Sequence, residues 1–578
     1  MERNESFLKK EYRKNLVPIM LSVLGGTINS LIDGIFVSRA MGADALAAVN
    51  LSMPVYLFIC VLGALVSFGA AALAAGEIAK GKVKKAQKCF KCGILLCIIV
   101  SVIIAVPGVM LCKVIANALA NGGSLSGEVY KYCVVLFAGA LPTILMYLFV
   151  AFLQIDGKLR AISIMILINV AADIVFDVFF IVIIDMGLYG AVTASIVAST
   201  LSCIFGCIAL LSDVTNFRLG LSVPDKKTLK GILRLGSTPA LGNLFDAMKL
   251  VSINSIVLVE LGERQAAVWA AINVLSEISM IIILGVPRAA FAMLRAYYIS
   301  KENSGVRIMM RLQAIDGAAL CAIFGAVIIF FSSPVGALFD IDESMLFPCI
   351  CIALYTLFMT LGSIMEQFFN CSGRVGISNV LSGLDRFFLP AAAALVMSEY
   401  GTRMWLFMPV SALLSFPAIL LLTYPPYRNA KNSGRPLSRL LLLDDKLERE
   451  NKIIDFSIKG DDESVCSACE QIQDFCTAND MTTGQTMKLG LAMEELITVM
   501  TGKLGKEDDI DMRAFAHAGM FGLRIRISGK RYDPFSDRDE EGDSLMGVEM
   551  IKKMSEVCEH NYTFGMNIIN IVFQMEDH

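Results

Sequence analysis

The sequence predicts an all-α polytopic membrane protein with twelve transmembrane helices in two six-helix lobes, followed by a C-terminal cytosolic domain with an α+β sandwich fold. The first observation is composition: the 578 residues are 56% hydrophobic and 18% charged, whereas soluble domains carry about 25% charged residues. The second is distribution, because the apolar excess lies in residues 15–423 and the rest has a soluble composition. The third is that Lys and Arg gather in every second loop.

Twelve segments are long and apolar enough to cross a bilayer, which takes about 20 largely apolar residues in a helix. They lie near residues 15–38, 49–79, 90–112, 131–153, 161–184, 187–212, 235–261, 266–292, 309–333, 347–369, 377–398 and 403–423. The charged N-terminal segment lacks a cleavable signal, so we expect the first apolar segment to be a signal-anchor helix.

The basic residues predict the orientation of these segments. They cluster before the first segment and after the second, sixth, eighth and twelfth, whereas one of the alternate loops carries Asp340, Asp342 and Glu343. We therefore expect a multi-pass protein of the cell inner (plasma) membrane, in contact with membrane lipid, with both termini in the cytoplasm. The net charge of −3 gives no reason to expect a nucleic-acid partner.

The membrane region contains an apparent internal duplication. The fourth segment ends in QIDGKLRAIS and the tenth in NCSGRVGISN, so Gly157 matches Gly373 and Lys158 matches Arg374 at a separation of 216 residues. This predicts an N-terminal lobe over residues 1–220 and a C-terminal lobe over 221–424 in parallel topology. Transporters with such repeats bind substrate between the halves and alternate access by rocking them. The alternative is that Gly-basic turns end many cytoplasmic helix hairpins.

Charged and polar residues inside the N-terminal lobe predict a cation-coupling site. Asn169, Asp173 and Asp177 are spaced i, i+4, i+8 and share one helix face, while Asp33 and Ser195 lie in other segments. Charges in the membrane usually face a cavity and serve function. Two carboxylates one turn apart repel when ionised, so they should hold a proton or attract a cation such as Na⁺. The alternative is a set of buried polar groups hydrogen-bonded between helices.

The C-terminal lobe offers a second set of possible substrate or ion groups, namely Asp246, Glu277 and Asp316. Asp246 and Lys249 are spaced i, i+3, and we expect them to neutralise each other. We expect a similar local pair between Asp385 and Arg386, and an interfacial position for Glu366. Apart from Lys249, Arg and Lys are scarce in the middle of the membrane segments.

The membrane region resembles the multidrug and toxic compound extrusion (MATE) family over roughly residues 10–425. The resemblance rests on NLVPIMLSVLGGTINSLIDGIFVSRAMGADALAAVN, which includes Pro18 and Asp33, and on DIVFDVFFIVIIDMGLYGAVTAS. Here Asp177 takes the family's Asp position, Asp173 stands where Asn is usual, and Ser195 takes the hydroxyl position. The resemblance implies an antiporter that exports small organic compounds, driven by H⁺ or Na⁺ through the N-terminal lobe. The additional carboxylate at Asp173 favours protons slightly.

The C-terminal part begins with a Pro- and Gly-punctuated linker, and LSRLLLLDDKLERE then predicts an amphipathic helix on the membrane surface within residues 425–450. Residues 451–578 form the cytosolic domain. We expect helices over MKLGLAMEELITVM and MGVEMIKKMSEVCEH, and strands over GLRIRIS and MNIINIVFQ. This order is typical of an α+β sandwich.

This domain resembles the histidine-kinase-type ATPase domains of anti-sigma-factor kinases, through LAMEEL with Glu495, YDPF, and Gly547 with MIKKMSEV. Val499 stands where the family has its metal-binding Asn, and no Asp precedes Gly529. A missing oxygen ligand weakens Mg²⁺ binding. The resemblance therefore implies a degenerate nucleotide site around Glu495, Gly529 and Gly547, with ATP binding unlikely, and a regulatory module that has a cytosolic protein partner.

Other motifs lead to no enzyme. There is no Walker A sequence, and the two CxxC pairs have only three His to join them, so we expect no metal site and no cofactor. We therefore expect a cation-coupled exporter. The alternatives are a flippase for lipid-linked precursors, which often needs a strongly cationic cavity, and a membrane receptor whose kinase-like tail signals.

Overall fold

The computed structural model describes residues 5–41, 43–120, 123, 125–210, 217–338, 344–429, 436–444, 446–504, 509–517, 519–536, 546–563 and 565–575. Within these ranges, it describes no side chain for residues 26–40, 43–44, 46–47, 50, 258, 261–264, 266–267, 270, 402, 424–429, 436, 449 and 462.

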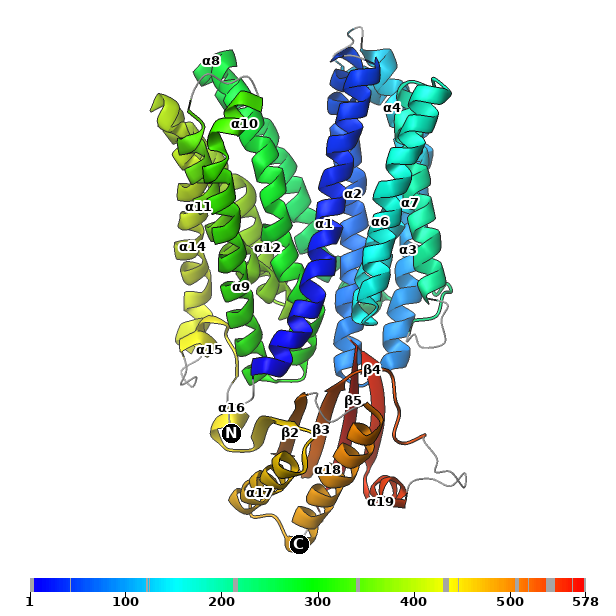
Figure 1. Cartoon of the computed structure of the whole chain (residues 1–578), viewed down its shortest axis with the longest axis vertical. Helices are drawn as coiled ribbons and strands as arrows, with labels where there is room; N and C mark the ends of the chain where they lie inside the picture. Colours follow the sequence, from blue (N-terminus) through cyan, green and yellow to red (C-terminus); the bar gives the residue numbers. More distant parts are fainter. Residues whose placement is uncertain are drawn as a thin grey trace.

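The helices stand in two groups above a small sheet domain, with α1 slanting from one group to the other (Figure 1). The first group comprises α1 (Glu5–Met41), α2 (Ala43–Ala79), α3 (Val83–Leu119), α4 (Ser126–Ala138), α5 (Ala140–Ile155), α6 (Leu159–Asp177) with the π-helical turn η1 (Val178–Ile183), and α7 (Leu188–Leu210). The second comprises α8 (Lys226–Ile299), α9 (Asn303–Phe330), α10 (Ser332–Leu338), α11 (Leu346–Cys371), α12 (Val375–Gly383), η2 (Leu384–Phe388), α13 (Leu389–Ser398), η3 (Gly401–Leu406) and α14 (Phe407–Asn429).

Among the described residues, nine helices are long and apolar enough to cross a membrane, and α4 with α5, bent by 50°, makes a tenth span. These ten correspond to ten of the twelve segments expected from sequence. The other two are the first segment, where the side chains of residues 26–40 lie outside the described set, and the segment at 235–261. A mostly helical multi-pass fold is therefore confirmed, while the number twelve stays a prediction.

The segments expected at 235–261 and 266–292 both lie in α8, which is 74 residues long. The chain nevertheless reverses within it. The indole of Trp269 donates a hydrogen bond to the side chain of Asn254, fifteen residues earlier, a separation of about 22 Å along a straight helix. Both ends of α8 also lie against α2, with Ile232 beside Gly69 and Ile299 beside Gly76. The helix thus has two antiparallel arms.

The turns that end matching helices share their geometry. Gly157 and Gly373 have φ angles of 74° and 76°, which favour glycine because a Cβ crowds the backbone there. The amide of Lys158 donates to the carbonyl of Leu153 (2.9 Å), and that of Arg374 donates to the carbonyl of Phe369 (2.9 Å). Two turns with the same backbone path at the predicted separation support an internal duplication.

The C-terminal domain is a five-stranded antiparallel sheet with helices on one face. Its strands are β1 (Ile453–Lys459), β2 (Asp509–His517), β3 (Met520–Ser528), β4 (Val557–Thr563) and β5 (Met566–Gln574), in the order β1-β2-β3-β5-β4. The covering helices are α17 (Asp462–Ala478), α18 (Thr483–Leu504) and α19 (Met546–Met554). Alternate strand residues such as Phe456, Met512 and Ile525 are buried in one core with α18, as expected for a strand that covers a helix layer.

Two sequence expectations for this part are wrong in detail. The helix expected over residues 546–560 ends at Met554, because Val557–His560 pair with β5 as part of β4. The amphipathic helix expected at LSRLLLLDDKLERE is two short turns, α15 (Pro436–Leu440) and α16 (Lys446–Arg449). The reason is packing: Leu441, Leu442 and Leu443 are buried, and Arg374 holds the carbonyls of Leu441 and Leu442 at 3.0 and 2.8 Å.

Candidate functional site

A cavity of about 250 Å³ lies within the first helix group. Its walls are mainly apolar and aromatic, with Met53, Tyr56, Tyr132, Met146 and Tyr147 among the residues that line it. Two predicted coupling residues, Asn169 of α6 and Ser195 of α7, also line it. Ligand sites typically combine such walls with a few polar groups, so this cavity is the candidate functional site.

The three predicted polar residues of α6 share one buried face. Asn169, Asp173 and Asp177 are 6%, 1% and 0% exposed, whereas Leu167 and Val175 on the opposite side are 68% and 62% exposed. The amide of Asn169 donates to the hydroxyl of Ser199 at 3.4 Å. Asp173 and Asp177 therefore continue the polar face that begins at the cavity wall, as the i, i+4, i+8 spacing predicts.

The sequence predicts that Asp33 belongs to the coupling site, but its side chain lies outside the described residues. Its backbone lies in α1, and its height along the bundle can be compared with that of the α6 residues. Helices α1 and α6 start at the same end, because both Glu11 and Asp156 interact electrostatically with Tyr562 of the C-terminal domain. They touch where Gly25 meets Ile166 and Val170. Eight residues farther along each parallel helix, residue 33 is level with the turn that holds Asp173 and Asp177.

Arg288, on the second arm of α8, also lines this cavity. Its guanidinium carbon lies 5.3 Å from the ring centroid of Phe68, a cation–π contact. Gln154 of α5 donates to the carbonyls of Arg288 (3.1 Å) and Ala289 (3.2 Å), which fixes this part of α8 against the cavity. The sequence analysis missed this cation, although a basic residue inside the apolar segment 266–292 was the signal for it.

The charged residues of the second helix group form a buried network that contains the expected pair of Asp246 and Lys249 but not the expected pair of Asp385 and Arg386. Arg386 bonds Asp246 at 2.7 Å and Glu366 at 3.4 Å, so it does not pair with its sequence neighbour Asp385. Lys249 lies 3.6 Å from Asp246 and 3.3 Å from the hydroxyl of Tyr355. Glu366 is 5% exposed and belongs to this buried network, while the interfacial depth expected for it stays a prediction. Asp246 is thus a shared partner of two cations.

The two remaining predicted groups of this half are placed differently. Asp316 of α9 accepts two hydrogen bonds from Arg13 of α1, at 2.8 and 2.6 Å, and joins the two helices near the C-terminal domain. Glu277 lies on the second arm of α8, with Lys249 and Asp246 as its charged neighbours. The structure therefore brings Asp246 and Glu277 toward one cluster and leaves Asp316 outside it.

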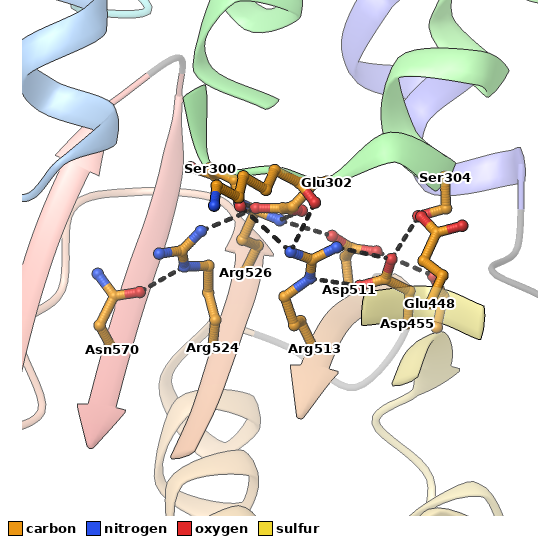
Figure 2. Close-up of polar contacts among 12 residues, drawn as sticks. Ser300, Glu302, Ser304, Glu448, Asp455, Asp511, Arg513, Arg524, Arg526 and Asn570 are labelled. Atoms are coloured by element: carbon orange, nitrogen blue, oxygen red, sulfur yellow. Dashed lines mark hydrogen bonds and ion pairs between the residues drawn. The ribbon is translucent and has the colours of Figure 1, made fainter. Parts of the chain in front are cut away.

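The helix-free face of the sheet meets the helix ends. Figure 2 shows Arg513, Arg524 and Arg526 reaching from β2 and β3 toward the turn between α8 and α9. Glu302 in that turn is 0% exposed and bonds Arg524 at 2.8 Å and Arg526 at 2.7 Å. Arg513 donates to the carbonyls of Ser300 and Lys301, both at 3.2 Å. Sequence patterns gave no sign of this interface.

Further contacts join the C-terminal domain to both helix groups. Asp455 of β1 accepts a hydrogen bond from Ser304 of α9, and Ser528 of β3 donates to Glu11 of α1 at 2.7 Å. Glu559 of β4 lies against Gly81, after α2. Burial by itself lowers the pKa of Arg526, but the charges and bonds of Glu302, Tyr297 and Asp511 together outweigh it, so this pKa lies well above its usual value. The domain is docked by buried, charge-assisted bonds.

The predicted nucleotide residues are only partly brought together. The carboxylate of Glu495 lies directly over Gly547, where a Cβ would clash with it. Gly529 follows β3 and has a φ of 142°. It packs against Leu504, the last residue of α18. Glu495 and Gly547 thus touch, whereas Gly529 lies about two turns of helix away.

Comparisons with known proteins agree with this geometry. The model of the MatE family matches residues 18–179, which run from α1 to η1. The probable multidrug resistance protein NorM of Thermotoga maritima is 23% identical over 405 residues, 68% of this chain and 86% of that protein. The multidrug export protein MepA of Staphylococcus aureus is 26% identical over 241 residues, 40% of this chain and 52% of MepA.

Solved structures show the same fold. The outward-facing form of a multidrug resistance MATE family transporter aligns with a TM-score of 0.68 at 21% identity, over 72% of this chain and 95% of that one. A transporter of the MOP superfamily from Pyrococcus furiosus, described as having a binding pocket of reverse polarity, aligns with a TM-score of 0.68 at 20% identity, over 74% and 98%. This chain therefore has the fold of MATE transporters, which are not enzymes, and the MatE family model covers α6, the helix that carries Asp173 and Asp177.

Proposed function

We propose that this chain is a secondary active antiporter that exports small organic compounds across the inner membrane in exchange for H⁺ or Na⁺. The observation that carries the proposal is the cavity in the first helix group, continuous with the buried face of Asn169, Asp173 and Asp177. An apolar cavity suits organic substrates, and adjacent buried carboxylates suit a coupling cation. The MATE fold supports this assignment.

Alternating access between the two halves is part of the proposal. Polar contacts join the two groups near the C-terminal domain: Arg295 of α8 donates to the carbonyl of Ala72 of α2, and Arg13 of α1 donates to the carboxylate of Asp316 of α9. We place this end in the cytoplasm, with both termini, because Lys80–Lys91 and Arg295–Arg311 lie there. Opening toward the cytoplasm would require these bonds to break.

Efflux from proteoliposomes with an imposed Na⁺ or pH gradient tests the proposal. A fluorescent organic compound should leave the vesicles faster under one of the two gradients, and dissipating that gradient should abolish the difference. An efflux rate that is unaffected by either gradient would contradict antiport.

We further propose that the C-terminal domain regulates transport by contact. Its sheet bonds the α8–α9 turn through Glu302 and touches the end of α2 through Glu559, so it bridges two elements that would separate when the cytoplasmic end opens. Its partner would then be the transporter itself, and a further cytosolic protein could compete for the same face. ATP has no required role in this scheme.

Transport by a Glu302→Gln variant tests the regulatory role. Weakening the bridge should change the rate of gradient-driven efflux in proteoliposomes by severalfold, whereas Glu450→Gln, at an exposed position, should not. An unchanged rate in a Glu302→Gln protein whose domain is demonstrably released would contradict it. Calorimetric titration of the full chain with Mg-ATP gives a separate check, for which we expect no saturable binding.

A further inference from the structure

The cavity carries a positive charge that no acid in the described part of the chain neutralises by contact. Arg288 is the one charged residue among the described residues that line it. The contact found for its guanidinium is the ring of Phe68, and no described carboxylate lies within ion-pair distance of it. The nearest acidic groups, Asp246 and Glu366, are both bonded to Arg386.

Asp33 is too far along the bundle to serve as the missing partner. Gly285 of α8 lies against Met20 of α1, so Arg288, one helical turn nearer the C-terminal domain, is level with the start of the apolar part of α1. Asp33 is thirteen residues beyond Met20 in the opposite direction, about 20 Å along the helix. The cavity therefore has its guanidinium at one end and the α6 carboxylates beyond the other.

A cation in this position is costly unless something compensates it. Arginine presents planar, bidentate donors that match carboxylate, sulfonate and phosphate groups. The Tyr and Met side chains around it offer adaptable apolar and aromatic walls. The site is therefore complementary to a molecule with an acidic head and an apolar body.

We propose that the cavity binds amphiphilic organic anions, with the acidic group held by Arg288 and the body against Tyr56, Met146 and Tyr147. This inference rests on the proposed export function and names its substrate class. The head could belong to a soluble organic acid or to an anionic lipid, since both present the same chemistry to a guanidinium. In either case Arg288 determines specificity, while the coupling cation is proposed to bind at the α6 carboxylates.

The test compares three probes that share one apolar body and differ in charge: 1-pyrenebutyrate, 1-pyrenebutanol and pyrenebutyl-trimethylammonium. Binding to the purified full chain is measured in neutral detergent. We expect the anion to bind about tenfold more tightly than the alcohol, which corresponds to about 1.4 kcal/mol. Arg288→Gln should remove this preference while keeping the affinity for the alcohol, and Arg288→Lys should keep part of it.

Arg160→Gln is the matched control, because Arg160 is an exposed arginine at the start of α6 and should leave all three affinities unchanged. An unchanged affinity for the alcohol shows that the Arg288→Gln protein is folded. If that protein is not folded, the anion preference of the wild type and of Arg288→Lys tests the inference. Competition by phosphatidylglycerol in nanodiscs identifies a lipid head, and its absence identifies a soluble acid. Equal or tighter binding of the cation, or an anion preference that survives in Arg288→Gln, would overturn the inference.

Export of the same probes separates this inference from the proposed function. Gradient-driven export of the alcohol or the cation without the anion would overturn the anion specificity and leave antiport standing. If no probe of any charge moves under either gradient in sealed vesicles, the antiport function itself fails.

Discussion

The carboxylate of Glu302, in the turn after α8, is fully buried against the guanidinium of Arg526 in β3, with 2.7 Å between Oε2 and Nη1. This bond joins a helix end of the transporter to the open face of the C-terminal sheet. Arg526 also lies over the ring of Tyr297, 4.7 Å from its centroid. The pair is the central contact of the interface drawn in Figure 2.

The first prediction follows from this pair. Removing one partner of a buried ion pair costs about 3–5 kcal/mol, so Glu302→Gln should release the C-terminal domain from the helix ends. Amide hydrogen exchange of β3 and cleavage of the linker by a protease should both become faster. Glu450→Gln, which removes an exposed charge 3.9 Å from Lys446, should leave both rates unchanged. Slow exchange in Glu302→Gln would mean that the arginines are held by other acids.

The second prediction concerns ion coupling. Asp177→Asn removes a carboxylate from the buried face of α6 without changing its shape, so gradient-dependent export should fall by about tenfold or more, equal to 1.4 kcal/mol or more. Efflux from proteoliposomes measures this, and Asp185→Asn in the loop after η1 serves as the exposed control. Full gradient dependence in a well-expressed Asp177→Asn protein would remove the residue from the site.

The third prediction addresses the buried network of the second helix group. Asp246→Asn leaves Arg386 with Glu366 alone and Lys249 with Tyr355, so the protein should lose on the order of 3 kcal/mol of stability. The melting midpoint in detergent should fall. Glu128→Gln breaks an exposed pair with Lys131, for which we expect at most about 1 kcal/mol. A midpoint equal to that of the control would show that Asp246 is dispensable.

The fourth prediction concerns topology. Lys84→Cys, in a Cys466→Ser background that removes the one exposed native cysteine, should resist an impermeant thiol reagent added to intact cells. Met186→Cys, at an exposed position in the loop between η1 and α7, should react. The reason is the accumulation of lysines in the α2–α3 turn. Labelling of Lys84→Cys from outside would reverse the orientation.

The fifth prediction is a pH dependence of the C-terminal domain. Burial, more than its bonds to Asn567 and Asp533, sets the pKa of His560 and lowers it from 6.5. The unfolded chain then binds the proton more readily, so this contribution to stability is present above about pH 6.5 and is lost as the pH falls below it. The protection factors of the amides of β4 and β5 in the full chain, which are corrected for the intrinsic pH dependence of exchange, should fall on acidification. His560→Gln should flatten this dependence, and an equally steep dependence in that variant would assign it to another group.

Much of the architecture follows from local sequence patterns. Runs of apolar residues predict the spans, and the spacing of Asn169, Asp173 and Asp177 predicts their common face, because helix geometry repeats within four residues. The closing strand predicted at residues 566–574 is observed as β5. These features depend on near neighbours in the chain, which is why the sequence contains them.

Other features depend on residues far apart and could not be predicted. Arg386 bonds Asp246 and Glu366 because neighbours at i, i+1 on a helix point to different sides, so Asp385 was the wrong partner. The interface at Glu302 unites residues more than 200 positions apart, and no local pattern marks such a pairing.

That separation also sets an order of events during synthesis. Glu302 leaves the ribosome 224 residues before Arg526, which at 5–20 residues per second corresponds to roughly 10–45 seconds. During that interval α9 to α14 must insert, while Glu302 does not yet have Arg524 and Arg526 as partners. The sheet can cover the helix ends only after β3 has been made, so a chain that stops before Arg526 lacks the partner of Glu302. Docking of the sheet therefore follows synthesis of both helix groups.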